Sequence, residues 1–411
     1  MQKFTVNNRN YHPPERPVVV VCLDGSADEY LDCAMVRTRM PNLSQMCITG
    51  WRGMARAAMP TFTNVNNSSI VTGVPPSVHG IGGNFFFDTS TGEEVMMNSA
   101  SFMRVETIFP AAQRAGRSVA VVTAKEKLRG IFAHGLISAG GIAFSAEQAH
   151  GATVESHGIA DVENLVGPTP AIYSGEASLF VLKAGAAMLE REIADFLYLS
   201  TTDFMQHKYA PEDLESLDFY AAIDQQLGRL LARGAVIGLT ADHGMNAKQL
   251  PDGTPNVIYL ESELIQQFGT GFRVILPITD PYVAHHGALG SFAQVYLPPQ
   301  MAVGPVREWL LSRRGICECH EPSIAVQLME LPADRIGDLV VASARDVVLG
   351  RTPADHDLSK LAGALRSHGG RYEEMVPLIF SEPLNDQYAG WVAGDVRNFD
   401  IFELVCNGTR R

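Results

Sequence analysis

The stretch Pro17-Val-Val-Val-Val-Cys-Leu-Asp24-Gly25 decides the fold of this 411-residue chain. An unbroken apolar run of this kind is typical of a strand that a parallel sheet buries on both faces. A carboxylate stands at the carboxyl end of the strand, and the glycine after it permits a tight turn. Because ligands bind at this edge of open α/β sheets, Asp24 is a candidate site residue. A capping or turn-forming aspartate is the alternative interpretation.

Further strands of the same kind follow, with helical segments between them. Strand candidates occupy 118–124, 195–200, 235–240 and 376–380, and helix candidates occupy 105–115, 174–193 and 213–232. Strands that alternate with helices in this way predict a mostly parallel sheet with helices on both faces. We therefore expect an α/β fold.

The pattern changes between residues 251 and 334. Short strand candidates and one helix lie close together there, at 255–260, 272–276, 291–297 and 306–312. Such a segment is typical of an α+β insertion. We expect an inserted cap domain over 251–334 and a discontinuous core over 1–250 and 335–411, with the core pattern resuming at 337–343.

The composition indicates a soluble globular protein and narrows its partners. Hydrophobic residues make up 46% of the chain and charged residues 19%, and the formal net charge is −13. So acidic a chain is a poor match for nucleic acid or an anionic membrane surface. The longest apolar run is too short to span a bilayer, and the polar N-terminus lacks the apolar segment of a signal peptide. The scattered cysteines do not suggest a disulfide framework, so we expect a cytoplasmic protein.

Carboxylates and imidazoles gather at the predicted strand exits and in glycine-flanked loops. They are Asp24, Asp203, His207, Asp242, His243 and His368. The exits of parallel strands share one edge of the sheet, so these side chains should converge there. Each of them alone is better explained as a cap or a core residue, but their joint occurrence favours metal binding. They exceed the four ligands of one tetrahedral zinc and suit two ions about 3.5–4 Å apart.

Residues 59–73 hold a candidate nucleophile, Thr63, just before a predicted helix. The polar residues 66–69 suit a loop that runs into a helix N-terminus, where free backbone N–H groups need acceptors. Anions bind well at such a position. An ordinary helix cap is the alternative for Thr63, and we interpret Asn66 as the residue that holds the loop.

Two further groups are candidates for anion binding. Asn84 lies beside two glycines, where its amide can approach an oxyanion, although such an asparagine is more often a turn residue. Lys125, Lys127 and Arg129 directly follow the strand candidate at 118–124. Their place at the carboxyl end of a parallel strand, in an acidic chain, favours anion binding over a solvated helix start.

In their order along the chain, these residues resemble the alkaline phosphatase superfamily, and most of all the branch that holds the nucleotide pyrophosphatases and phosphodiesterases. The resemblance runs from residue 18 to about residue 380. It rests on the motifs Asp24-Gly, Thr63-x-x-Asn66, Thr72-Gly, His79-Gly-Ile, Asn84, Asp203-x3-His207, Asp242-His243-Gly and His368-Gly. Within that branch, residues 60–64 and 123–129 resemble the phosphonoacetate hydrolases. The resemblance implies an alkaline phosphatase-like core and two zinc ions per subunit. The ligands of one ion would be Asp203, His207 and His368, and those of the other Asp24, Asp242, His243 and the Thr63 oxygen.

The resemblance also implies the roles of the residues that meet the substrate. Thr63 would be the nucleophile, in place of the serine of true alkaline phosphatases. Asn84 would bind a phosphoryl oxygen, and Lys125 and Lys127 would hold the carboxylate of phosphonoacetate. His285, on a glycine-flanked loop of the cap, would be a further substrate contact, with a surface-loop histidine as the alternative.

The implied activity is zinc-dependent hydrolysis of the C–P bond of phosphonoacetate, a small anionic substrate, to acetate and phosphate through a phosphothreonine at Thr63. Three alternatives stay open. A phosphodiesterase or nucleotide pyrophosphatase on the same di-zinc scaffold would need an aromatic slot for a base and no paired lysines. An isomerase similar to phosphoglycerate mutase would normally use serine and often manganese. A catalytically silent, metal-stabilised binding protein would release no phosphate. A homodimer is one option for the assembly.

Overall fold

The computed structural model describes the whole chain except residues 1–2, 279–288, 360, 362 and 411. Its largest sheet has seven strands in the order β4-β19-β10-β3-β9-β7-β8. The strands are β3 Val18–Cys22, β4 Trp51–Arg56, β7 Val119–Thr123, β8 Ile142–Ser145, β9 Phe196–Ser200, β10 Val236–Thr240 and β19 Met375–Phe380. The pairs β10–β3, β3–β9, β9–β7 and β7–β8 are parallel, and β19 runs antiparallel to both of its neighbours. The predicted α/β fold with a mostly parallel sheet is confirmed.

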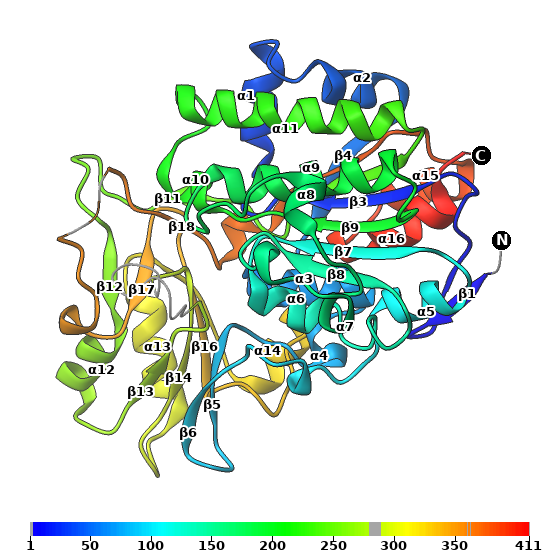
Figure 1. Ribbon diagram of the computed structural model, residues 1–411. Coiled ribbons are helices and arrows are strands. Elements are labelled where there is room, and N and C mark those ends of the chain that lie inside the picture. The colour runs from blue at the N-terminus through cyan, green and yellow to red at the C-terminus, as the bar shows by residue number, and fades with distance from the viewer. Residues whose placement is uncertain (1–2, 279–288, 360, 362, 411) are drawn as a thin grey trace.

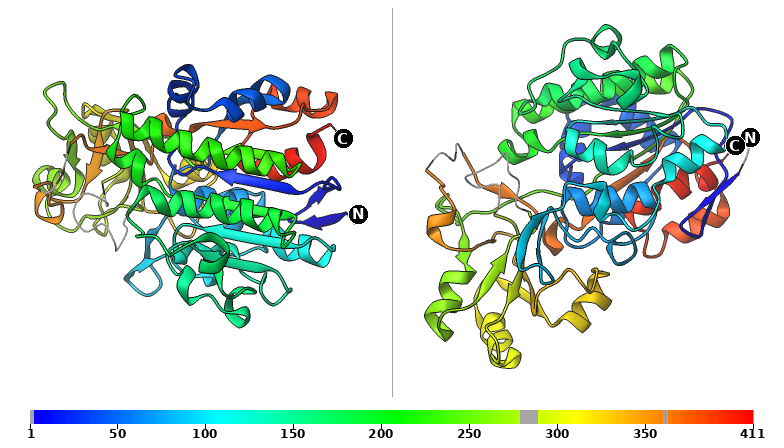
Figure 2. Two further views of the ribbon diagram at one scale, coloured as in Figure 1. Left: turned by 45° about the horizontal axis from the view of Figure 1, so that its top comes forward. Right: turned by 60° about the horizontal axis from the view of Figure 1, so that its bottom comes forward.

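Strand β3 shows how the sequence produces a layer of helices on each face. All of its residues are buried. Because successive side chains of a strand point to opposite faces, Val19 and Val21 pack into one hydrophobic cluster, and Val18 and Val20 pack into another. Helices α9 and α11 contribute to the first cluster and run alongside the strands (Figure 2). Helices α3, α5 and α6 contribute to the second. Their bounds are α3 Thr63–Thr72, α5 Ile108–Arg114, α6 Glu126–Phe132, α9 Gly175–Glu190 and α11 Leu214–Ala232.

A second, antiparallel sheet has the strand order β13-β14-β16-β15 and lies beside the first (Figure 1). Helices α12, α13 and α14 pack on it and share its hydrophobic cluster. The bounds are β13 Arg273–Ile275, β14 Phe292–Tyr296, β15 Ile316–His320, β16 Leu339–Ser343, α12 Leu260–Phe268, α13 Val303–Ser312 and α14 Pro322–Met329. The same cluster contains Phe62 and Val65 of the core, so this smaller sheet packs directly against the segment that carries Thr63.

The structure corrects one strand assignment. The sequence predicted that residues 337–343 begin the return of the core, but β16 pairs with β14 and β15 in the smaller sheet. The reason is that a fully buried apolar strand has the same pattern at the centre of either sheet. The division into core and cap stays a prediction, and β16 argues for a later return to the core.

In the part of the chain that the structure describes, no helix is long and apolar enough to cross a membrane. All six cysteines lie in that part and form no disulfide, which agrees with their scattered spacing. The cytoplasmic compartment stays a prediction.

Candidate active site

Four neighbouring parallel strands deliver chemically active side chains to one edge of the large sheet. Asp242 follows β10, Asp24 follows β3, Asp203 follows β9 and Lys125 follows β7. The arrows of these parallel strands point towards the smaller sheet, so the edge that carries these side chains faces it (Figure 2). The convergence that the strand-exit pattern predicts therefore occurs.

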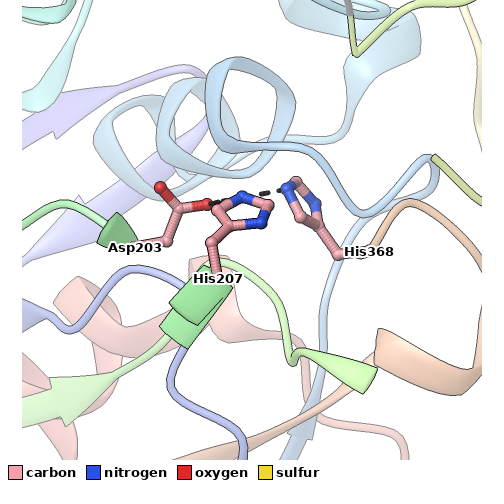
Figure 3. Close-up of side chains that lie close together, drawn as sticks. All are labelled: Asp203, His207 and His368. Carbon is pink, nitrogen blue, oxygen red and sulfur yellow. Dashed lines mark ion pairs between the residues drawn. The ribbon is translucent and has the colours of Figure 1, made fainter. Parts of the chain in front are cut away.

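The first cluster consists of Asp203, His207 and His368 (Figure 3). Asp203 is the residue before the short helix α10, Phe204–Lys208, and its side chain makes no capping hydrogen bond; the helix brings His207 back to the carboxylate one turn later. His207 Nε2 lies 3.0 Å from Asp203 Oδ2, and His368 Nε2 lies 3.6 Å from the same oxygen. One ligand atom from each residue lies within 4.8 Å of the others, which is a spacing that one metal ion can bridge.

The second cluster consists of Asp24, Asp242 and His243, whose side chains are fully buried. His243 Nε2 lies 3.3 Å from Asp24 Oδ1 and 3.3 Å from the hydroxyl Oγ1 of Thr63. The candidate nucleophile thus lies directly beside this cluster. The rings of His243 and His368 stack with centroids 3.6 Å apart, so the two clusters adjoin.

All three imidazoles are oriented in the same way. Each donates its Nδ1–H to a backbone carbonyl: His207 to Arg366 at 2.8 Å, His243 to Gly244 at 2.9 Å and His368 to Thr61 at 2.7 Å. The bond fixes the tautomer and leaves Nε2 facing the cluster. Histidines that bind metals are held by such second hydrogen bonds. The sequence carries no signal for these acceptors, because they are main-chain groups.

In the second cluster, His243 Nε2 lies 3.3 Å from Asp24 Oδ1, but this contact is not a hydrogen bond. Neither carboxylate oxygen of Asp24 accepts a hydrogen bond from the residues that the structure describes, and both are buried. Burial, together with Asp203 and Asp242, raises the pKa of Asp24 well above its ordinary range. Buried carboxylates without donors are costly unless a cation compensates them. A metal ion therefore fits here, and carboxylates with imidazoles are a donor set that zinc accepts.

The neighbouring titratable groups also have shifted pKa values. Burial alone would lower the pKa of His243, but Asp242, Asp24 and Asp203 raise it to about 10. Burial and the adjacent His243 hold the pKa of His368 well below its usual range. Burial would raise the pKa of Asp203, but His207 and Lys125 hold it well below its ordinary value. The site is a strongly interacting set of charges rather than a group of independent residues.

The segment that carries Thr63 is held rigidly. Thr63 is the first residue of α3, and Phe62 before it is extended. Asn66 Oδ1 accepts the N–H of Ala58 at 2.6 Å, and its Nδ2 donates to the Ala58 carbonyl at 2.9 Å. The predicted role of Asn66 in holding this loop is confirmed. On the other side, a Cβ on Gly369 would lie 2.4 Å from the Phe62 ring, so only glycine permits the loop after His368 to approach so closely.

Among the predicted anion-binding residues, Lys125 has a measured contact with a cluster. Lys125 Nζ is 3.9 Å from Asp203 Oδ1, so it borders the first cluster, and Lys127 lies half-buried in α6. Asn84 is buried, its N–H donates to the Pro277 carbonyl at 2.7 Å, and its Oδ1 accepts no hydrogen bond from the described residues. Arg129 pairs with Glu126 within its own helix. His285 lies outside the described residues.

Comparisons with known proteins agree with this arrangement. Residues 18–370 match the family model of type I phosphodiesterase / nucleotide pyrophosphatase. Crystal structures of phosphonoacetate hydrolase from Sinorhizobium meliloti 1021, in complex with phosphonoformate and with phosphonoacetate, are 44% identical to the chain. Each covers 98% of both chains with a TM-score of 0.93. Murine ectonucleotide pyrophosphatase / phosphodiesterase 5 is 17% identical over 95% of this chain and 94% of its own, with a TM-score of 0.63, and shares the fold.

The family match covers most of the chain and includes every residue of both clusters. The resemblance to the alkaline phosphatase superfamily is confirmed. The chain belongs to the type I phosphodiesterase / nucleotide pyrophosphatase family of hydrolytic enzymes.

Proposed function

We propose that this protein hydrolyses the C–P bond of phosphonoacetate to acetate and phosphate, with Thr63 as nucleophile and two zinc ions. The observation that carries the proposal is the 44% identity, over 98% of both chains, with a phosphonoacetate hydrolase that was solved with phosphonoacetate bound. The alternative, a phosphodiesterase or nucleotide pyrophosphatase, is not favoured, because the likeness to the ectonucleotide enzyme at 17% identity extends only to the fold.

Each cluster would hold one ion. When bound, zinc supplies positive charge that neutralises phosphoryl oxygens and lowers the pKa of a neighbouring hydroxyl. The ligands of one ion would be Asp203, His207 and His368, and those of the other Asp24, Asp242, His243 and Thr63 Oγ1. Compensation of the donor-free Asp24 carboxylate supports this assignment.

The chain's own groups would carry the reaction in two steps. Thr63 Oγ1 attacks phosphorus and forms an O–P bond while the C–P bond breaks, and its proton passes to solvent. The N-terminus of α3 and the Asn84 amide stabilise the negative charge on the phosphoryl oxygens. The electron pair of the C–P bond is delocalised into the adjacent carboxylate, which Lys125 and Lys127 hold, and the carbon takes a proton from water. Water then hydrolyses the phosphothreonine to phosphate and free Thr63.

The test is a substrate panel on zinc-loaded enzyme, with phosphonoacetate, phosphonopyruvate, 2-aminoethylphosphonate and p-nitrophenyl phosphate esters. We expect the highest kcat/KM with phosphonoacetate, measured as phosphate release. A higher value with a p-nitrophenyl phosphate diester would overturn the proposal in favour of a phosphodiesterase. Metal analysis of the purified protein should give two zinc ions per chain.

The nucleophile has a separate test. Thr63→Ala should reduce kcat on the order of 10⁴-fold or more, as the loss of a covalent nucleophile does in other enzymes, while zinc still binds. Thr63→Ser is the matched control, because it retains a hydroxyl at the same place and should keep measurable turnover. Substantial activity in Thr63→Ala would reject Thr63 as the nucleophile.

A further inference from the structure

The side-chain amide of Asn67 joins the nucleophile helix to the second cluster. Asn67 lies in α3, one turn after Thr63, and is fully buried. Its Nδ2 donates to Asp242 Oδ2 at 2.9 Å and to the Thr63 carbonyl at 3.1 Å. One amide group therefore contacts both the residue that bears the candidate nucleophile and a ligand of the second cluster.

The orientation of this amide is fixed by chemistry. Its Oδ1 accepts hydrogen bonds from the Tyr198 hydroxyl at 2.5 Å and the Ser200 hydroxyl at 2.8 Å. An amide oxygen accepts two hydrogen bonds and an amide nitrogen donates two, so all four positions of Asn67 are used. In the reversed orientation, the NH₂ group would face the two hydroxyls and the oxygen would face a carboxylate.

The hydrogen bond from Asn67 completes the support of Asp242. Asp242 Oδ1 already accepts the backbone N–H groups of Gly25 at 3.1 Å and His243 at 3.0 Å. Asn67 supplies the donor to Oδ2, so both oxygens of this carboxylate are oriented, whereas those of Asp24 have no donor among the described residues. Asp242 is thus positioned by the protein alone.

Tyr198, which donates a hydrogen bond to Asn67, is itself held by packing in the hydrophobic core. Tyr198 lies on β9, is fully buried, and packs its ring against Phe109 and Phe402 with centroid distances of 5.8 and 6.0 Å. A ring held in this way presents its hydroxyl at a fixed place. The contacts form a continuous chain from the aromatic core through Tyr198 and Asn67 to Asp242.

We propose that Asn67 is a positioning residue that aligns Asp242 for its metal ion and fixes the start of α3, and with it Thr63, relative to that ion. This inference rests on the proposed function for the identity of the metal. It goes beyond it by assigning a role to a residue outside both candidate ligand sets.

The test is the zinc affinity of Asn67→Leu, a change of similar size that removes all four hydrogen bonds. Folded, zinc-free protein is titrated with Zn²⁺ in competition with a chromophoric chelator. We expect about 10–100-fold weaker binding at one site, the range found for groups that orient metal ligands, and unchanged binding at the other. To identify the weakened site, the titration is repeated with Asp203→Asn, which disables the first cluster, and with Asp24→Asn, which disables the second. Asn67→Leu should lower the affinity only in the Asp203→Asn background.

A milder pair of variants keeps the test decisive if Asn67→Leu fails to fold. Tyr198→Phe removes one donor to Asn67 and should weaken the same site several-fold. Tyr11→Phe is the matched control, because the Tyr11 hydroxyl is also buried but has no hydrogen-bond partner among the described residues, and it should change neither affinity. Wild-type zinc affinity at both sites in Tyr198→Phe would overturn the proposal. No substrate is used, so the outcome is independent of whether phosphonoacetate is the substrate.

Discussion

The two clusters contain similar residues, but the surroundings of their carboxylates shift the pKa values in opposite directions. In the first, Asp203 has His207 at 3.0 Å and Lys125 at 3.9 Å, and these groups hold its pKa well below the ordinary value. In the second, Asp24 accepts no hydrogen bond from the described residues, and burial with two neighbouring carboxylates raises its pKa against the opposing effect of His243 at 3.3 Å. The groups around Asp203 therefore favour its ionised form, whereas burial and the neighbouring carboxylates disfavour the ionised form of Asp24 in spite of His243.

The same residue type can therefore stabilise or destabilise the metal-free fold. A carboxyl whose pKa is lowered by folding is favoured in its ionised form by the folded state, and one whose pKa is raised is disfavoured. In the second cluster, ionised Asp24 therefore lowers the stability of the metal-free fold, and a bound metal ion would offset this effect. Neutralising the two aspartates should have opposite effects on the stability of the metal-free protein.

The largest expected effect comes from Asp24→Asn. Activity should fall on the order of 10³-fold or more, because a ligand of the ion beside Thr63 is lost. In the presence of a chelator, however, the free energy of unfolding should rise by about 1–3 kcal/mol, because a neutral amide replaces a carboxyl whose ionised form the folded state disfavours. Kinetics on zinc-loaded enzyme and urea denaturation of chelated enzyme measure the two effects.

Asp203→Asn is the matched variant for the opposite sign. It should also abolish most activity, but it should destabilise the chelated protein by about 3 kcal/mol, because His207 and Lys125 lose their counter-charge. If both variants shift the stability of the chelated protein in the same direction, the contrast between the clusters is wrong.

A smaller effect on activity is expected when either of the candidate carboxylate-binding residues, Lys125 and Lys127, is replaced. Lys127→Ala should raise the KM for phosphonoacetate about 10–100-fold, the cost of one charge-assisted hydrogen bond, and change that for an uncharged aryl phosphate ester much less. Lys125→Ala should raise the same KM but also raise the affinity for zinc at the first cluster, because it removes a cation that borders Asp203 and repels the metal ion. Equal changes for both substrates in Lys127→Ala would reject its role as a carboxylate-binding residue.

The sequence predicted the parts of the site that depend on side-chain type and strand exits. Asp24 and Asp242 follow apolar runs, and the exits of parallel strands meet at one edge, so their convergence was inferable. The backbone acceptors of the imidazoles were not, because a carbonyl such as that of Thr61 has no side-chain signature. Strand β16 was misassigned because its apolar pattern fits the centre of either sheet.

Two adjacent asparagines also show what residue type alone cannot predict. Asn66 and Asn67 are equivalent in a polar run, and the sequence assigned a structural role only to Asn66. The helical turn of α3 directs Asn66 to the loop at Ala58 and Asn67 to Asp242. Which of two neighbouring amides reaches a metal ligand is a property of the packed helix and not of the residue types.

The smallest expected effect concerns His79, a buried imidazole outside both clusters. His243 has three carboxylates around it and a pKa of about 10, whereas burial, Arg104 and Arg335 lower the pKa of His79 to about 3. The N–H of Ile81 donates to its Nδ1 at 3.1 Å, so His79 is neutral, and Nε2 lies 2.8 Å from the Ser69 hydroxyl. His79 therefore tests whether a buried imidazole without neighbouring carboxylates has a lowered pKa, in contrast to the raised pKa of His243.

The sign of its pH dependence follows from the lowered pKa. Above pH of about 6.5 neither state binds the proton, and below it the unfolded state takes up a proton that the folded state excludes until about pH 3. The contribution of His79 to stability is therefore complete above about pH 6.5 and falls with decreasing pH, by up to about 1.4 kcal/mol per pH unit.

The test compares wild type with His79→Gln in chelated protein. The glutamine retains a polar group near Ser69 but cannot titrate. The unfolding free energy of the variant, measured by urea denaturation between pH 7.5 and pH 5, should consequently decline less steeply than that of the wild type. If the unfolding free energies of the two proteins decline in parallel, folding does not lower the pKa of His79, and the contrast with His243 is wrong.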